Sequence, residues 1–96
     1  MRNKVIVTYD ISERDRLRKV HETMLGFGDP LQYSVFACQL SAKERVLMLS
    51  ALTEVMNSKE DRMLIVDLGP VGRSSESRMK LVGKPVEVAI RNPLVV

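Results

Sequence analysis

The sequence predicts a single α+β domain, and three observations lead to that fold class. The chain has 96 residues, 45% of them hydrophobic and 28% charged, which suits one globular core. Short β-branched runs alternate with stretches whose apolar residues recur at helical spacing. Clusters of Gly, Pro, Asn and Ser separate these segments. Strands and helices should therefore alternate along one domain that spans residues 1–96.

The first strand is predicted over about residues 4–9, because residues 5–7 form a β-branched run without Gly or Pro. This run does not alternate with polar residues, so both faces of the strand are expected to be covered. A helix should follow, with Ser12 as its N-cap, Asp15 three residues later as in a capping box, and its end near Gly26. Its core-facing stripe consists of Leu17, Val20, Met24 and Leu25.

The middle of the chain is predicted to contain a turn at Asp29-Pro30 and then a segment of strand formers over residues 31–40. This segment forms either one long strand or two short strands bent near Tyr33-Ser34. A second helix should begin after the capping box of Ser41 and Glu44. Its buried stripe consists of Met48, Leu49, Leu52, Val55 and Met56.

The last third of the chain begins with another apolar strand over residues 63–68, which Gly69-Pro70 should end. Residues 70–83 are predicted to form a basic connecting loop, and residues 86–90 alternate as in a half-buried strand. With two strands in the middle segment, this order is the split βαβ arrangement of the ferredoxin-like fold, with an additional C-terminal strand. We expect a core over about residues 1–69, and a homodimer in which residues 84–96 pair with the partner's sheet.

The charge distribution indicates a polyanionic partner. The net charge is +3 over residues 1–20, −3 over residues 21–70 and +3 over residues 71–96. The chain has only four Phe and Tyr residues, so binding to RNA or DNA should depend on phosphate contacts, with little sequence preference. The predicted phosphate-binding residues are Arg14, Arg16, Arg18, Lys19, Arg73, Arg78 and Lys80.

Other patterns bear on location and on alternative sites. No apolar run approaches the ~20 residues of a membrane span, and the first residues lack the apolar region of a signal peptide. The single cysteine, Cys38, cannot form an intramolecular disulfide and is interpreted as a small core residue. We therefore expect a cytoplasmic protein without membrane contact. His21 has no second ligand at metal-binding spacing and is interpreted as a packing or surface residue.

Asp10 is the candidate functional residue, because an acid at the end of a central strand, before a helix, occupies a common position for chemistry. Two readings stay open: a metal ligand, or an acceptor for local backbone N–H groups. A lone carboxylate is a poor Mg²⁺ site, but two Asp10 side chains facing each other across a dimer axis could share one ion. The neighbouring Tyr9 and the later Phe36 are interpreted as either substrate-contacting or structural residues.

Two motifs carry a resemblance to a known family. The segment Val7–Ser12 (VTYDIS) and the segment Gln32–Leu40 (QYSVFACQL) resemble the two signature strands of the CRISPR-associated protein 2 family. The resemblance implies a ferredoxin-like homodimer, an endonuclease dependent on Mg²⁺ or Mn²⁺ that acts on RNA or DNA, and a partner of the CRISPR integrase. Asp10 matches the family's metal ligand, and Tyr9 and Phe36 match positions tied to activity. The family's usual Arg before the second motif is absent here, where Asp29-Pro30 stands.

Three hypotheses follow. The chain is a metal-dependent endonuclease acting at Asp10, or a non-catalytic dimeric scaffold that holds DNA for an integrase. The third hypothesis is a ferredoxin-like small-ligand or regulatory module, which stays open because the fold alone does not determine function. It predicts no affinity for nucleic acid.

Overall fold

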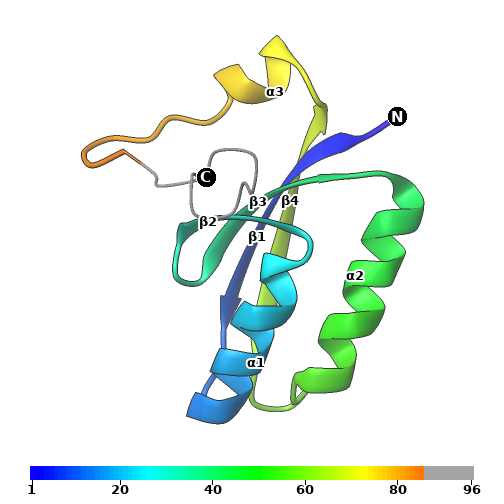
Figure 1. Ribbon diagram of the computed structural model, residues 1–96, viewed down its shortest axis with the longest axis vertical. Coiled ribbons are helices and arrows are strands. Elements are labelled where there is room, and N and C mark those ends of the chain that lie inside the picture. Colours follow the sequence, from blue (N-terminus) through cyan, green and yellow to red (C-terminus); the bar gives the residue numbers. More distant parts are fainter. Residues whose placement is uncertain (86–96) are drawn as a thin grey trace, which may run out of the picture.

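The computed structural model describes residues 1–85, which form a four-stranded antiparallel sheet covered on one face by two helices (Figure 1). The strand order β2-β3-β1-β4 and the order of the elements confirm the predicted ferredoxin-like split βαβ arrangement, because β3 lies between the parallel strands β1 and β2. The elements are β1 (Asn3–Asp10), α1 (Arg14–Leu25), β2 (Gly28–Gln32), β3 (Val35–Leu40), α2 (Ala42–Val55), β4 (Arg62–Pro70) and α3 (Arg73–Ser77).

The core lies between the sheet and the two helices. Val7 of β1, Phe36 of β3 and Met24 of α1 have no exposed surface, and Met48 and Leu52 of α2 are equally buried. These positions confirm the predicted helical stripes. Burial alternates along the second half of β1, because successive side chains of a strand point to opposite faces of the sheet. Cys38 is buried in the same cluster, as predicted for a small core residue.

The middle segment forms two strands, β2 and β3, joined at Tyr33-Ser34, so the second of the two open alternatives is correct. The predicted turn at Asp29-Pro30 is wrong, because both residues lie within β2 and pair with Ala37 and Phe36 of β3. β2 is an edge strand of the described sheet, and an edge strand tolerates proline because one of its sides needs no N–H donor.

Helix α1 begins one residue later than predicted. Its N-cap is Glu13, whose carboxylate accepts hydrogen bonds from the backbone N–H groups of Asp15 and Arg16. The predicted cap, Ser12, instead donates from its N–H and its hydroxyl to Asp61. The cap of α2 is as predicted, with Ser41 and Glu44 in a full capping box.

The region after β4 also differs from the prediction. β4 continues through Gly69 to Pro70, since the strand still pairs there with Asn3 of β1. The predicted connecting loop contains the short helix α3, in which the buried Ser75 hydroxyl donates to the Gly72 carbonyl and accepts from the Gly72 N–H. Lys4 joins this helix to β1 through an ion pair with Glu76 at 3.0 Å.

The second face of the sheet exposes apolar side chains within residues 1–85. Leu64 and Val66 of β4 are 58% and 40% exposed in the single chain. The final strand at residues 86–90, which was predicted to pair with a second subunit, lies outside the described residues. The predicted dimer therefore stays a prediction.

Candidate active site at the end of β1

Asp10 is the last residue of β1 and its side chain is exposed. Its cross-strand neighbour is Arg62 of β4, and residues that pair directly across two strands present their side chains on the same face of the sheet. Sequence reasoning missed Arg62, because only the strand register puts it beside Asp10. The pair gives this end of the sheet a carboxylate and a guanidinium with access to solvent.

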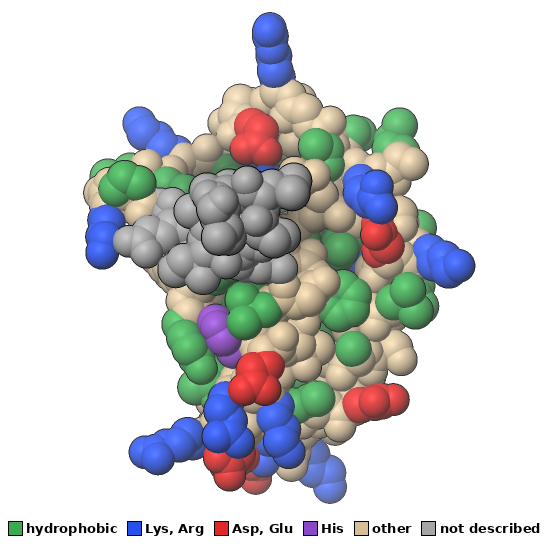
Figure 2. Space-filling model, viewed as in Figure 1, with side chains coloured by type: hydrophobic (Ala, Val, Ile, Leu, Met, Phe, Trp, Pro, Cys, Tyr) green, Lys and Arg blue, Asp and Glu red, His purple; other side chains and the backbone are tan. Residues whose placement is uncertain are grey.

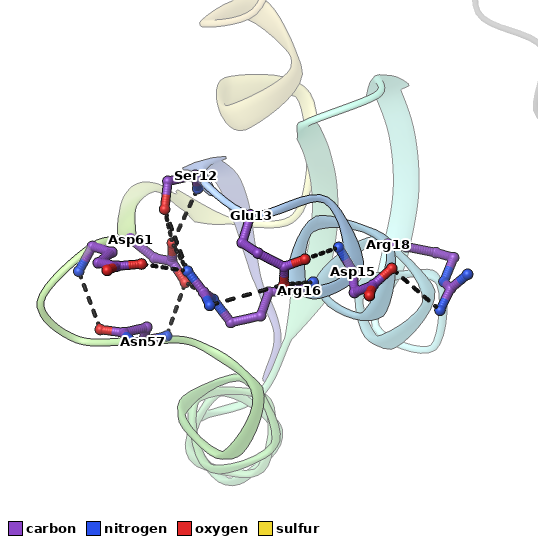
Figure 3. A network of polar contacts seen from close by, with 8 residues as sticks. Ser12, Glu13, Asp15, Arg16, Arg18, Asn57 and Asp61 are labelled. Carbon is purple, nitrogen blue, oxygen red and sulfur yellow. Dashed lines mark hydrogen bonds and ion pairs between the residues drawn. The ribbon is translucent and has the colours of Figure 1, made fainter.

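The turn that follows Asp10 is held by Asp61, which precedes β4 (Figure 3). Its Oδ1 accepts hydrogen bonds from the N–H of Ser12 at 3.1 Å and from the Ser12 hydroxyl at 3.3 Å. Its Oδ2 accepts from Arg16 Nε at 2.9 Å and from the N–H of Asn57 at 2.8 Å. The Asp61 side chain has 0% exposed surface, so this carboxylate joins three segments of the chain away from solvent.

Arg16 is the charged partner of Asp61. Its ion pairs and its low exposure disfavour the predicted contact with phosphate. Its Nη2 lies 3.0 Å from Glu60 in addition to the bonds with Asp61, and its side chain is only 23% exposed. The Arg16 guanidinium lowers the pKa of the Asp61 carboxyl well below its usual range, and the hydrogen bond with Asp61 raises the pKa of Arg16. Arg16 therefore fixes the turn and is not a free cation.

Tyr9 and Phe36 lie in the core directly behind this turn. Phe36 has no exposed surface and Tyr9 is 6% exposed, and their rings pack with a centroid distance of 6.2 Å. Burial raises the pKa of the Tyr9 hydroxyl, which donates a hydrogen bond of 2.8 Å to the carbonyl of Tyr33. This burial supports the structural reading of both side chains, which support the end of β1 from inside.

An aromatic pair lies beside this end of the molecule. The ring of His21 in α1 stacks on the ring of Tyr33 at a centroid distance of 4.1 Å and an interplanar angle of 1°. His21 is half-buried, as expected for a packing or surface residue, whereas Tyr33 is 54% exposed. Sequence reasoning placed Tyr33 at a bend and in the second motif, and the tertiary fold brings it against α1.

The predicted phosphate-binding residues form two groups. Arg14, Arg18 and Lys19 are exposed on α1, near the end of β1, where Lys and Arg side chains gather in Figure 2. The second group lies around α3, at the opposite end of the sheet (Figure 1), and consists of Arg73, Arg78 and Lys80. Arg78 of this second group donates to the carbonyl of Leu68. Only the α1 group shares an end of the molecule with Asp10.

The donor set at Asp10 fits a metal ion only in part. Carboxylate oxygens are suitable ligands for Mg²⁺ and Mn²⁺, and Asp10 is exposed to solvent. Within residues 1–85, however, no group of three or more His, Cys, Asp or Glu side chains could hold a metal ion. The nearby Asp61 already accepts five hydrogen bonds, so it has little capacity left for a metal ion. The described residues therefore form no complete metal site at Asp10, and further oxygens would have to come from a second copy, water or substrate phosphate.

No helix in the described part of the chain is both long and apolar enough to cross a membrane.

Comparisons with known proteins agree with one another. Residues 3–75 match the family model described as CRISPR associated protein Cas2. The chain is 38% identical over 96 residues to the CRISPR-associated endoribonuclease Cas2 of Geobacter sulfurreducens, covering 100% of both chains. It is 34% identical over 91 residues to the CRISPR-associated endoribonuclease Cas2 1 of Rhodospirillum rubrum, covering 95% of this chain and 88% of the relative. The crystal structure of Streptococcus pyogenes Cas2 superposes with a TM-score of 0.71 at 29% identity, covering 83% of this chain and 99% of that one.

Proposed function

This chain belongs to the CRISPR associated protein Cas2 family, and on that premise we propose that it is a metal-dependent endoribonuclease whose cleavage centre forms around Asp10. The observation that carries the proposal is an exposed carboxylate at the end of a central strand, on a turn held by the buried Asp61. Both relatives named above are endoribonucleases by name, which favours RNA as the substrate.

Each residue at this end has a role that follows from its chemistry. Asp10 is the proposed ligand for Mg²⁺ or Mn²⁺, which when bound would supply a polarised phosphoryl oxygen and a water of lowered pKa. Arg62, across the strand pair from Asp10, would hold a phosphate oxygen near it. Arg14 and Arg18 on α1 would hold the neighbouring phosphates through their exposed guanidinium groups.

The centre requires a homodimer in this proposal, because no group of three or more metal-binding side chains forms within residues 1–85 of one copy. Two Asp10 side chains would bring two carboxylates to one ion, which Mg²⁺ sites commonly use together with water and phosphate. The exposed Leu64 and Val66 on the second face of the sheet support a second subunit, since exposed apolar surface of this kind favours association.

The test compares Asp10→Asn with Asp67→Asn. The second variant removes a carboxylate from β4 of the same sheet, where Asp67 pairs with Val5 near the opposite end of β1. Single-stranded RNA should be cut by the parent protein with Mg²⁺ and not after chelation. Asp10→Asn should lose cleavage by at least about 100-fold and lose Mn²⁺ binding in calorimetry, while RNA affinity is kept or rises slightly because a charge that repels phosphate is gone. Asp67→Asn should keep both RNA cleavage and Mn²⁺ binding. Cleavage by Asp10→Asn at the parent rate would refute the assignment.

A second candidate function is a non-catalytic dimeric scaffold that binds DNA and joins the CRISPR integrase during spacer acquisition. The small donor set at Asp10 favours this candidate. If neither the parent nor the Asn variant cuts RNA or DNA, while both bind duplex DNA and co-purify with the integrase subunit, the scaffold is the better description.

A further inference from the structure

Building on the proposed function, we propose that Tyr33, backed by His21, is a stacking platform for one unpaired nucleobase of the RNA strand beside Asp10. Among residues 1–85, no other residue at this end of the molecule offers an exposed aromatic face, since Tyr9 and Phe36 are buried. The platform gives the protein a contact with the base in addition to its contacts with phosphate.

The geometry holds the Tyr33 ring in place while leaving one of its faces open. One face stacks on His21 with almost parallel planes, and the side chain is still 54% exposed. His21 is in turn supported from the core, because its ring packs edge-on against Phe36 at 5.3 Å. The ring of Tyr33 is therefore supported from behind, and ordering it on binding costs little entropy.

The backbone of Tyr33 is fixed as well. Its carbonyl oxygen accepts a hydrogen bond of 2.8 Å from the Tyr9 hydroxyl, and His21 Nδ1 lies 2.9 Å from the same oxygen. A carbonyl only accepts, so Nδ1 carries the proton that it donates here. The next residue, Ser34, accepts a hydrogen bond of 3.1 Å from the N–H of Tyr9, which precedes Asp10. These bonds tie the platform to the strand that carries the proposed metal ligand.

Two arginines lead from the start of α1 to the platform. Arg14, Arg18 and His21 are separated by four and three residues, which puts them on one face of the helix. The helical rise separates Arg14 from His21 by about 10 Å along the axis. In Figure 2 the histidine lies at the surface above the Lys and Arg side chains of this end, beside hydrophobic side chains. Cations along a strand backbone and an aromatic face for a base are the two features of single-strand binding.

This arrangement selects the class of ligand. A stacked aromatic accepts any base, because every base has a π-face, but a base inside a duplex has both faces covered by its neighbours. The platform should therefore favour single-stranded RNA over a duplex of the same length without selecting a sequence, in agreement with the low sequence preference expected from the composition.

The test measures binding of single-stranded RNA in the Asp10→Asn background, so that cleavage does not interfere. Tyr33→Leu should weaken binding about 5-fold or more, and Tyr33→Phe should bind as the parent does, because stacking needs the ring and not the hydroxyl. Leu47→Ala on α2 is the matched control for loss of an exposed apolar side chain and should change nothing. Thermal unfolding of each variant shows whether the fold is intact, and the hydrogen bonds of the Tyr33 carbonyl do not depend on its side chain.

A second measurement identifies the partner of the ring as a base. Single nucleotides of the RNA are replaced in turn by abasic ones. At one position the abasic nucleotide should weaken RNA binding by the parent as much as Tyr33→Leu does. At that position it should not weaken RNA binding by Tyr33→Leu any further. Equal affinities of Tyr33→Leu and the parent, while Arg14→Gln and Arg18→Gln weaken binding, would overturn the platform and leave the proposed function intact. Absence of any RNA binding by the parent would overturn both.

Discussion

The two ends of β1 each have a carboxylate bonded to an arginine, but only one of these carboxylates is buried. At the end with Asp10, the side chain of Asp61 has no exposed surface and binds Arg16 and two backbone N–H groups. At the opposite end, Asp67 of β4 binds Arg45, Asn3 and the N–H of Gly69 with 36% of its side chain exposed. The same kind of ion pair, an aspartate with an arginine, is thus buried at one end of β1 and partly exposed at the other.

The difference shows which ion pair holds the structure. An exposed ion pair contributes little to stability, because water competes for both partners and salt screens them. A buried carboxylate that loses its charge leaves its donors and its cation without a partner, which is costly. The segment that carries Asp10 is thus braced by the stronger of the two networks, as a site that needs fixed geometry requires.

The largest expected effect comes from comparing Asp61→Asn with Asp67→Asn. Asp61→Asn should lower the free energy of unfolding by about 2–3 kcal/mol, because Arg16 loses its charged partner inside the protein. This corresponds to a fall of roughly 10 °C in the midpoint of thermal unfolding. Asp67→Asn should lower the midpoint by less than half as much. Equal shifts in calorimetry would mean that burial does not distinguish the two ends.

A smaller effect separates the structural arginine from the binding arginines on α1. Arg14→Gln and Arg18→Gln should each lower the slope of log affinity against log salt by about 0.7 on single-stranded RNA, because each removes one phosphate contact. Arg16→Gln should leave this slope unchanged and lower the unfolding midpoint instead, since its guanidinium binds Asp61 and Glu60. Filter binding over a series of salt concentrations measures the slopes. A reduced slope for Arg16→Gln in the folded protein would reassign Arg16 to RNA.

The smallest effect is the dependence of stability on acid. Arg16 lowers the pKa of Asp61 from its ordinary 3.8, and a hydrogen bond from Arg2 lowers the pKa of Glu44 from 4.5 to about 2. Both groups bind protons more weakly in the folded chain, so their stabilisation is present above the ordinary pKa values and is lost as the pH falls below them.

The unfolding midpoint of the parent should therefore fall between about pH 5 and about pH 2. The unfolding midpoint of Asp61→Asn should fall least over this pH range. The midpoint of Glu44→Gln should fall more than that of Asp61→Asn and less than that of the parent, because Glu44 is partly exposed. Thermal unfolding followed by circular dichroism measures all three. Parallel curves would show that neither carboxylate contributes to the acid response.

The sequence by itself determined the features that depend on neighbours along the chain. The capping box of Ser41 and Glu44, the apolar stripe of α2 and the apolar run of β1 are local patterns, and each predicted its element correctly. The same holds for Asp10, since a strand followed by a helix puts an acid at the end of a sheet strand wherever the rest of the chain goes.

The tertiary structure alone decided the features that depend on residues far apart. Asp61 lies 45 residues from Arg16, and it draws Ser12 away from capping α1 and Arg16 away from solvent. The strand register puts Arg62 beside Asp10, and an edge position lets Pro30 stay in β2. The fold also stacks Tyr33 on His21. These contacts leave no pattern in the sequence, because a hydrogen bond or a stacked pair depends on distance in space, which the periodicity of a single segment does not record.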